Sequence, residues 1–520
     1  MTLQHPRIAY VILGVSTILA FLLRLRHIGN LELDVDTSCA IASAISIDHY
    51  PDKIWRLLNY SDSRPLSVLP VYLLQVLDIP VNYLSTELLG LLLWIVTAWV
   101  FYLSLRFFAS ARKAVLLTAL LILYFGAITT AEFTPYNSEA VSITLLSICL
   151  YLYLRLTYTG YQSAKLVALL GILLGSLIYA KFQNAPMGLL IAGFTYVGVW
   201  RAGTWPLFTV AGILPTLAIN LVYLSRGKVS EFWVNYLFNY AEYSYTTKFS
   251  PLSLPERFNP LQALNYLVRD YQSAILFGGV LLSIFLGGMY YSFFRKKPTE
   301  KNLIGFGFAL ILTSLYAILQ SGNYFGHYKL YLIIPLLFFV AVLGTALPRK
   351  AGLLVSSMVV LTMIVQTGVN LIRPIDYTPY QFRRSDLRVA EFISENTVPG
   401  SGIVVWGWLP KFHYLTGQPC GYRSSITFHF FLKSNLLDDR VAHFLDDLEE
   451  NQPGMILEDE GGHHSHLTAI FKPLDSFPLI GDYLARHYVK IGSEEGISFY
   501  KRKEMASLTE NAAAVCKIDP

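Results

Sequence analysis

The chain has 520 residues, of which 54% are hydrophobic and 14% are charged, and its formal net charge is +5. Soluble domains usually carry about 25% charged residues, so this composition argues against a soluble protein and predicts a polytopic membrane protein. The small net charge gives no indication of a nucleic-acid partner. Four cysteines have no metal-ligand spacing, and the sequence specifies no disulfide pairing among them: Cys39, Cys149, Cys420 and Cys516.

Apolar runs along the first three quarters of the chain predict about eleven transmembrane helices, because one crossing takes about 20 apolar residues. The first run has no small-residue cleavage site after it, so we expect a retained helix and not a signal peptide. Segment 64–78 is shorter and contains two prolines, which indicates a helix lying in the membrane interface. The predicted spans are 8–24, 84–105, 114–130, 138–156, 166–180, 185–200, 206–224, 273–294, 302–320, 330–347 and 351–370.

The distribution of basic residues predicts the orientation of these spans. With a cytoplasmic N-terminus, the clusters of Lys and Arg fall in cytoplasmic turns, and the short outer turn 131–137 has neither. If segment 64–78 were a span, every later loop would be inverted. We therefore expect the C-terminus outside. The cytoplasmic turns would carry Arg106, Arg112, Lys113, Arg155, Lys165, Arg201, Arg295, Lys296, Lys297, Lys301, Arg349 and Lys350.

The predicted domains are a membrane module over 1–375, with long outer loops at 25–83 and 225–272, and a smaller domain over 376–503. In the smaller domain charges become frequent and apolar runs shorten. Strands that alternate with helices predict an α/β domain outside the membrane, followed by a disordered tail over 504–520. The expected strands are 402–407, 454–457 and 497–501, and the expected helices are 383–396, 440–450 and 477–487.

Asp34 and Asp36 directly follow the first span, and they are the first candidates for chemistry. A carboxylate held against a helix end inside a cavity is costly and usually indicates function. We expect Asp36, with Asp34 beside it, to act as a catalytic base. Further polar side chains fall on the same predicted side of the membrane: Arg64, Asn137, Glu139, Lys181, Gln183, His327, Tyr328 and Lys329.

Several of these residues also have a purely structural interpretation. Lys181 and Lys329 can extend from helix ends to the lipid head groups. Glu139 can be a charge favoured by the N-terminus of a helix. His327 can make an interfacial hydrogen bond, and Asp34 can be a solvated neighbour of Asp36. The function of each residue therefore stays open at this point.

At these positions the chain resembles the GT-C glycosyltransferases that use polyprenyl-phosphate sugars. That branch includes protein O-mannosyltransferases and lipid A aminoarabinose transferases. The family's first outer loop has Asp-Glu, where this chain has Asp36-Thr37, and then a basic residue before Pro-Pro-Leu, where one proline is missing here. The similar segments are Arg64-Pro65-Leu66, Asn137-Ser138-Glu139, Lys181 to Gln183, His327-Tyr328 before Pro335, and Trp406-Gly407 with Tyr414 to Gly417.

The resemblance implies an enzyme of the bacterial plasma membrane that transfers a sugar from a polyprenyl-phosphate donor to an acceptor hydroxyl on the outer face, with inversion. It implies that Asp36 is the base and that Glu139 orients the acceptor or assists Asp36. It also implies that Arg64, Lys181 and His327 contact the donor phosphate. This branch generally uses no divalent cation, so no metal or other cofactor is expected. The sugar and the acceptor stay unidentified.

Segment 461–466 contains His463, His464 and His466, and clustered histidines can bind a transition metal. Without a nearby cysteine we interpret it as a polar loop. Two other functions also remain in view. A transporter or flippase should show internal repeats and charges near mid-span, and neither is evident. A non-catalytic scaffold would use the α/β domain as a binding module.

Overall fold

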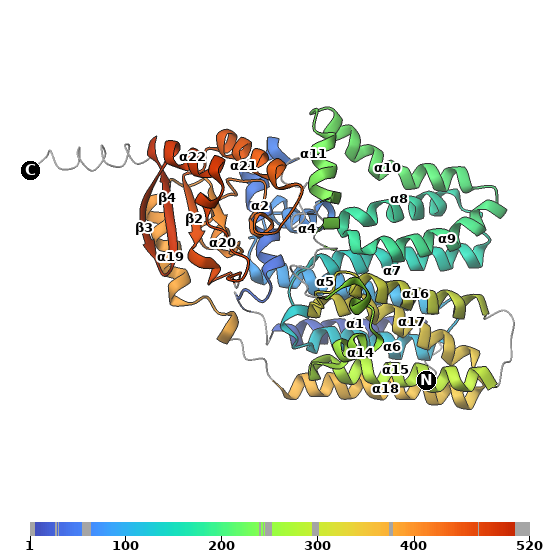
Figure 1. The fold of residues 1–520 in the computed structure, drawn as a ribbon. Coiled ribbons are helices and arrows are strands. Elements are labelled where there is room, and N and C mark those ends of the chain that lie inside the picture. Colours follow the sequence, from blue (N-terminus) through green and yellow to red (C-terminus); the bar gives the residue numbers. More distant parts are fainter. Residues whose placement is uncertain are drawn as a thin grey trace, which may run out of the picture. The chain divides into compact units, whose positions relative to one another are not determined.

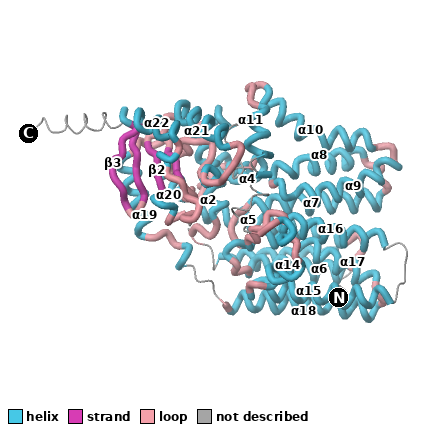
Figure 2. Tube along the Cα trace, in the orientation of Figure 1, coloured by secondary structure: helices cyan, strands magenta, loops and turns pink. Residues whose placement is uncertain are grey.

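The computed structural model of this protein describes residues 6–25, 29, 31–54, 64–238, 241, 242, 244, 252–293, 301–373, 378–465 and 467–504. The chain is helical apart from one small sheet (Figures 1 and 2). It divides into two compact units. The helical unit comprises residues 1–29, 87–231 and 243–376, and the sheet unit comprises 30–86, 232–242 and 377–520.

All eleven predicted spans fall on helices. Eight helices in the described ranges are long and apolar enough to cross a membrane, and one of them is α17 counted together with the preceding turn (Gly326–Ala346). In contrast, α6, α8 and α9 have only 17 residues each. The number of about eleven therefore stays a prediction. The helices are α1 (Pro6–Leu25), α5 (Tyr83–Leu105), α6 (Ala111–Ala127), α7 (Ser138–Thr159), α8 (Ala164–Ala180), α9 (Ala185–Arg201), α10 (Trp205–Leu224), α15 (Tyr271–Phe293), α16 (Lys301–Leu319), α17 (Leu330–Ala346) and α18 (Arg349–Ile372).

Helix α17 lies at the centre of the helical unit. In its apolar segment 89% of the residues are buried inside the protein, whereas in α10 only 17% are buried. A helix that is apolar on all sides is stable only where neighbours or lipid cover it, and α17 is covered by protein. The helix α10 instead exposes leucine, isoleucine and valine side chains. This difference is expected if the unit lies in a bilayer, where exposed apolar surface is not penalised.

Helices α8 and α10 approach closely through glycines, and they lie side by side in Figure 1. Gly171 and Gly175 form a GxxxG pattern on α8. A Cβ atom added at Gly175 would lie 2.0 Å from the carbonyl oxygen of Gly212 on α10. Small residues at this spacing let two helix backbones pack tightly in membranes.

The sheet unit contains four strands in the order β1-β2-β4-β3. Strands β1 (Ile403–Trp406) and β2 (Met455–Asp459) are parallel, with Ile403 opposite Met455, and β4 (Ile497–Arg502) pairs antiparallel with β2 and with β3 (Tyr488–Glu494). The strands β1, β2 and β4 confirm the prediction. The sequence analysis missed β3, because it is a mostly exposed edge strand whose register shifts between Lys490 and Gly492, so it lacks a regular apolar pattern.

Alternate residues of β1 and β2 bury opposite faces of the sheet. Val405 and Leu457 pack under α19 (Arg384–Asn396) and α20 (Lys411–Thr416). Trp406 and Ile456 pack on the other face, against α21 (Leu437–Asn451) and α22 (Pro478–His487). Helices thus cover both faces of the sheet, and the alternation of strands and helices had predicted a small α/β domain. The short helix α20 was not predicted.

The first predicted outer loop folds with the sheet unit. It contains α2 (Val35–His49) and α4 (Pro65–Val76), and the second of these was expected at 64–78. The backbone N–H of Cys420 donates to Ser46 Oγ at 2.8 Å, and Lys53 Nζ donates to Asn451 Oδ1 at 2.6 Å. The sheet unit is therefore built from segments that are far apart in sequence.

Four further short helices occur in or near the second predicted outer loop, 225–272: α11 (Val229–Trp233), a π-helical turn (Val234–Phe238), α13 (Leu254–Arg257) and α14 (Pro260–Val268). Short turns are η1 (Pro51–Lys53), η2 (Ala131–Phe133), η3 (Phe182–Asn184) and η5 (Gly326–Lys329) in the first part of the chain. The tail beyond Glu504, with Cys516, and His466 lie outside the described residues. The domain boundary predicted at 375/376 stays a prediction.

Candidate functional site

Glu139 lies at the start of α7, and its position follows from the capping of that helix. Asn137 is the N-cap, and its Oδ1 accepts a hydrogen bond from the backbone N–H of Ala140 at 3.0 Å. Glu139 is then in the first turn, where a negative charge is favoured. Its side chain is fully buried and accepts a hydrogen bond from Ser138 Oγ at 3.2 Å.

Lys181 supplies the countercharge for Glu139. It caps the C-terminus of α8, and its ammonium forms an ion pair with Glu139 Oε1. Its side chain is only 2% exposed, and its Nζ lies 5.1 Å from the centroid of the Tyr328 ring. A buried charge is tolerated when it is paired and hydrogen-bonded. The structure thus brings together Asn137, Glu139, Lys181 and Tyr328, four of the residues that the sequence analysis placed on one side of the membrane.

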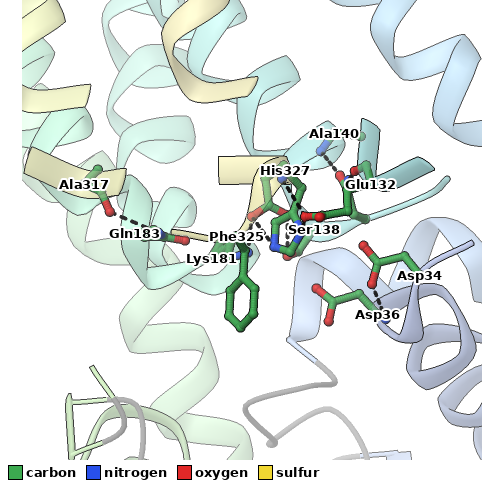
Figure 3. Close-up of polar contacts among 12 residues, drawn as sticks. Asp34, Asp36, Glu132, Ser138, Ala140, Lys181, Gln183, Ala317, Phe325 and His327 are labelled. Carbon is green, nitrogen blue, oxygen red and sulfur yellow. Dashed lines mark hydrogen bonds and ion pairs between the residues drawn. The ribbon is translucent and has the colours of Figure 1, made fainter. Parts of the chain in front are cut away.

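His327 lies in η5, directly before α17, and connects two carboxylates of the helical unit. Its Nε2 is 3.8 Å from Glu139 Oε1, and its Nδ1 is 3.4 Å from Glu132 Oε2. Its backbone N–H also donates to Glu132 Oε2 at 3.1 Å. Figure 3 shows the His327 ring and Glu132 facing each other, with Lys181 near them. We call Glu132, Glu139, Lys181, His327 and Tyr328 the Glu139 cluster.

Glu132 was missed by the sequence analysis. Burial raises the pKa of its carboxyl, but the hydrogen bonds and positive charge of His327 outweigh burial, and the net pKa lies below the usual value. Glu132 therefore stays ionised at neutral pH. Its sequence signal is weak, since it is a lone acid in the turn that precedes Asn137.

Two other predicted residues of the helical unit make different contacts. Gln183 is buried, and its Nε2 donates to the carbonyl oxygen of Ala317 at 3.0 Å. Lys329 forms an ion pair with Asp270. Its Nζ also lies 3.4 Å from Ser273 Oγ and 5.1 Å from the centroid of the Tyr266 ring. Asp270 was not anticipated, because it is far from Lys329 in sequence.

Asp34 and Asp36 belong to the sheet unit, at the start of α2. Asp34 is the N-cap, and its Oδ1 accepts a hydrogen bond from the backbone N–H of Asp36 at 3.0 Å (Figure 3). Both side chains are half-buried. Arg64 precedes Pro65 and is the N-cap residue of α4 in the same unit. The two aspartates thus differ in role, since Asp34 holds the first turn of the helix and Asp36 lies within it.

Glu32 is a third acid near the start of α2, and the sequence analysis did not select it. Its Oε1 accepts a hydrogen bond from Ser38 Oγ at 2.5 Å, and that hydroxyl is 2.7 Å from the Tyr83 hydroxyl. Burial raises the pKa of Glu32, although Lys411 and Ser38 act in the opposite direction. This carboxyl therefore binds a proton more readily than Glu132 does.

The histidine loop of the sheet unit makes structural contacts. His464 Nε2 lies 2.5 Å from the carbonyl oxygen of Glu495, and its backbone N–H donates to Asp459 Oδ1 at 3.1 Å. Asp459 Oδ2 also accepts from the backbone N–H of Ser465 at 2.7 Å. These bonds anchor the loop to the end of β2, which is what a polar surface loop requires.

The chain thus combines an apolar helical unit, with acid and base groups at helix ends, and a smaller α/β unit. Comparison with solved structures confirms the resemblance seen in the sequence at the level of the fold. ArnT from Cupriavidus metallidurans bound to undecaprenyl phosphate matches with a TM-score of 0.59 and 12% identity, over 94% of this chain and 97% of that chain.

A second match is the archaeal oligosaccharyltransferase AglB from Archaeoglobus fulgidus in complex with an inhibitory peptide and a dolichol-phosphate. Its TM-score is 0.51 at 10% identity, over 95% of this chain and 74% of that chain. The same protein in the apo form gives a TM-score of 0.51 at 11% identity. No protein-family model matches the chain, and no curated protein matches it by sequence. At these identities the likeness is one of fold.

Proposed function

We propose that this protein is a membrane glycosyltransferase that moves a sugar from a polyprenyl-phosphate donor to an acceptor hydroxyl, with inversion. The observation that carries the proposal is the fold shared with ArnT over nearly the full length of both chains, in a structure that holds undecaprenyl phosphate. AglB, with its dolichol-phosphate, supports a lipid-linked donor in the same way. A cluster of acids and bases in the helical unit, in which Glu139 and Lys181 are buried, is consistent with this chemistry.

We assign the role of general base to Asp36. The base takes the proton of the acceptor hydroxyl while the hydroxyl oxygen attacks the anomeric carbon, and the polyprenyl phosphate leaves with the electron pair of the broken bond. Asp34 already accepts the backbone N–H of Asp36. We therefore assign Asp34 a positioning role, in which it fixes the first turn of α2.

We assign donor binding to the cations of the Glu139 cluster and to Arg64. Lys181 and His327 carry the N–H groups that a phosphate needs, and a leaving phosphate is stabilised by positive charge placed beforehand. Glu139 positions Lys181 through the ion pair between them. Asn137 and Glu132 keep Glu139 and His327 in place through the contacts described above. Gln183, Tyr328 and Lys329 would then act as supports of this cluster.

We further propose that the protein lies in a bacterial plasma membrane, with the N-terminus in the cytoplasm and the sheet unit outside. Its outer position would give the acceptor access without crossing the membrane. The acceptor is a glycan, a lipid or a protein that carries a free hydroxyl. The donor tail would remain in the bilayer while its phosphate and sugar enter the site.

The test is turnover of a panel of radiolabelled polyprenyl-phosphate sugars by the purified full-length protein, with thermal stability measured in parallel. Asp36→Asn should lower turnover about a hundredfold or more, which is the usual contribution of a general base. Asp48→Asn is the matched control, because Asp48 is an exposed acid on the same helix. Unchanged turnover in a stable Asp36→Asn variant would contradict the assigned base. Failure of the wild type on every donor would contradict the donor class.

A further inference from the structure

A groove of about 290 Å³ opens among α5, α6, α17 and α18 of the helical unit, away from the Glu139 cluster. Its walls are almost entirely aliphatic. Lys113 is the only charged side chain among the residues that line it. The aliphatic lining includes Leu117, Val340, Ala341, Val360, Leu361 and Ile364.

Lys113 contributes the ammonium group of its side chain to this groove. Its Nζ donates to the carbonyl oxygen of Gly344 at 3.3 Å, and within the described ranges no ion pair joins it to an acid. Gly344 lies near the end of α17, and Lys113 lies in the first turn of α6. The charge of Lys113 therefore lies near the ends of α6 and α17, beside the apolar walls of the groove.

More basic residues surround this end of the helices. Arg106 follows the last residue of α5, Arg112 precedes Lys113, and Arg349 and Lys350 begin α18. The described carboxylates of the helical unit lie instead near the opposite helix ends. They are Glu87, Glu132, Glu139, Glu231, Glu256 and Asp270. The mouth of the groove is thus positive, and its walls are apolar.

We propose that the groove binds one acidic phospholipid, with an acyl chain along α17 and α18 and its phosphate at Lys113. The apolar walls favour an acyl chain, which a free inorganic anion does not have. The ammonium of Lys113 favours a negatively charged head group over an uncharged one. Basic pockets between transmembrane helices recognise acidic lipid head groups in this way. The site is separate from the proposed donor site and does not depend on the proposed reaction.

The test is lipid binding to the full-length protein in detergent, counted by native mass spectrometry. Phosphatidylglycerol and phosphatidylcholine with identical acyl chains are compared. We expect phosphatidylglycerol to bind at least tenfold more tightly. Lys113→Gln should remove most of this preference, whereas Lys113→Arg should keep it. Lys165→Gln is the matched control, because Lys165 is another basic residue at the start of a helix but does not line the groove.

A second variant tests the apolar part of the groove. Ser357 lines it, and Ser357→Trp should fill the space and weaken the binding of both lipids by about the same factor. Equal binding of the two lipids by the wild type would overturn the proposal, as would an unchanged preference in folded Lys113→Gln. Tighter binding of polyprenyl phosphate than of phosphatidylglycerol, sensitive to Ser357→Trp, would overturn it in favour of a donor-tail site. If Lys113→Gln does not fold, the Ser357→Trp result decides alone.

Discussion

The pairing of Glu139 with Lys181 connects two helix ends through one buried contact. Asn137 sets Glu139 in the first turn of α7, and the end of α8 presents Lys181. Water does not solvate either charge, because both side chains are buried. Each charge is therefore stabilised by the other, and this dependence can be measured.

Replacing Lys181 with methionine should destabilise the protein by about 3–5 kcal/mol, because Glu139 would be left buried without its partner. The double variant Lys181→Met with Glu139→Gln should recover much of that loss, since it removes both charges. Thermal unfolding of the purified protein measures both effects. Lys165→Met, at the exposed start of the same helix, is the control and should leave the melting temperature unchanged. A double variant as unstable as the single one would contradict the pairing.

His413 makes the stability of the sheet unit depend on pH. It is 1% exposed, and burial lowers its pKa from 6.5 to about 4, against the opposing effect of its hydrogen bond with Gln418. The unfolded chain therefore binds more protons than the folded chain between pH 4 and 6.5, so stability rises with pH in that window. At about 1.4 kcal/mol per pKa unit, the loss from pH 7 to pH 4 is about 3 kcal/mol.

The measurement for His413 is the melting temperature at several pH values. His413→Asn should make the loss of stability between pH 6.5 and 4 smaller. Some loss should remain, because burial also lowers the pKa of His429. A pH profile identical to that of the wild type would show that His413 is not buried in its neutral form.

At the scale of residues, the sequence predicted best where a local rule applied. Asn137 and Asp34 were selected as candidates for chemistry, and the structure shows that both are helix N-caps, a role for which their residue types are well suited. Glu132, Glu32 and Asp270 were missed, because their partners lie far away along the chain. The contact of Glu132 with His327, for example, joins residues that are 195 positions apart. A charge pair of this kind has no local signature.

At the scale of elements, the glycines between α8 and α10 fix how closely two helices approach. Gly175→Leu should force the helices apart, since even a Cβ atom would overlap the backbone of Gly212. We expect a loss of stability of several kcal/mol, as for other overpacked sites at which the backbone cannot move freely. The measurement is thermal unfolding in detergent. Gly193→Leu is the control, because a Cβ at Gly193 would meet no atom within 4 Å.

Helices and strands were predicted well where they are buried on one face or on all sides. The long apolar helices and the buried strands β1 and β2 have strong patterns, and their bounds differ from the prediction by a few residues. The exposed strand β3 and the six-residue α20 carry no such pattern. Their positions are set by pairing with β4 and by packing under the sheet, which are tertiary effects.

At the scale of the whole molecule, the orientation in the membrane is a prediction that labelling can check. Basic turns are retained in the cytoplasm, so Lys350 should be inside, whereas Ser253 should be outside. Both residues are exposed. In a cysteine-free background, a maleimide reagent that does not cross membranes should label Ser253→Cys in intact cells. It should label Lys350→Cys only after permeabilisation. The opposite pattern would invert the proposed topology.

Each of the two compact units is built from segments that are separated along the chain. The sequence suggested a membrane module followed by a separate domain, because composition changes once, near residue 376. Composition does not reveal that α2 packs with α4 and with α20 of the sheet unit. That assembly depends on specific contacts such as Ser46 with Cys420, which join residues 374 positions apart.

The hydrogen bond between Ser46 and Cys420 has a consequence for biosynthesis. Ribosomes make α2 early, but its partner is made only after nearly the whole helical unit has been synthesised. Contacts of such large sequence separation form late and slowly. The segment with Asp34 and Asp36 therefore reaches its final structure near the end of translation. A nascent chain that is interrupted before Cys420 would carry the proposed base on an unanchored helix, so incomplete chains are expected to be inactive.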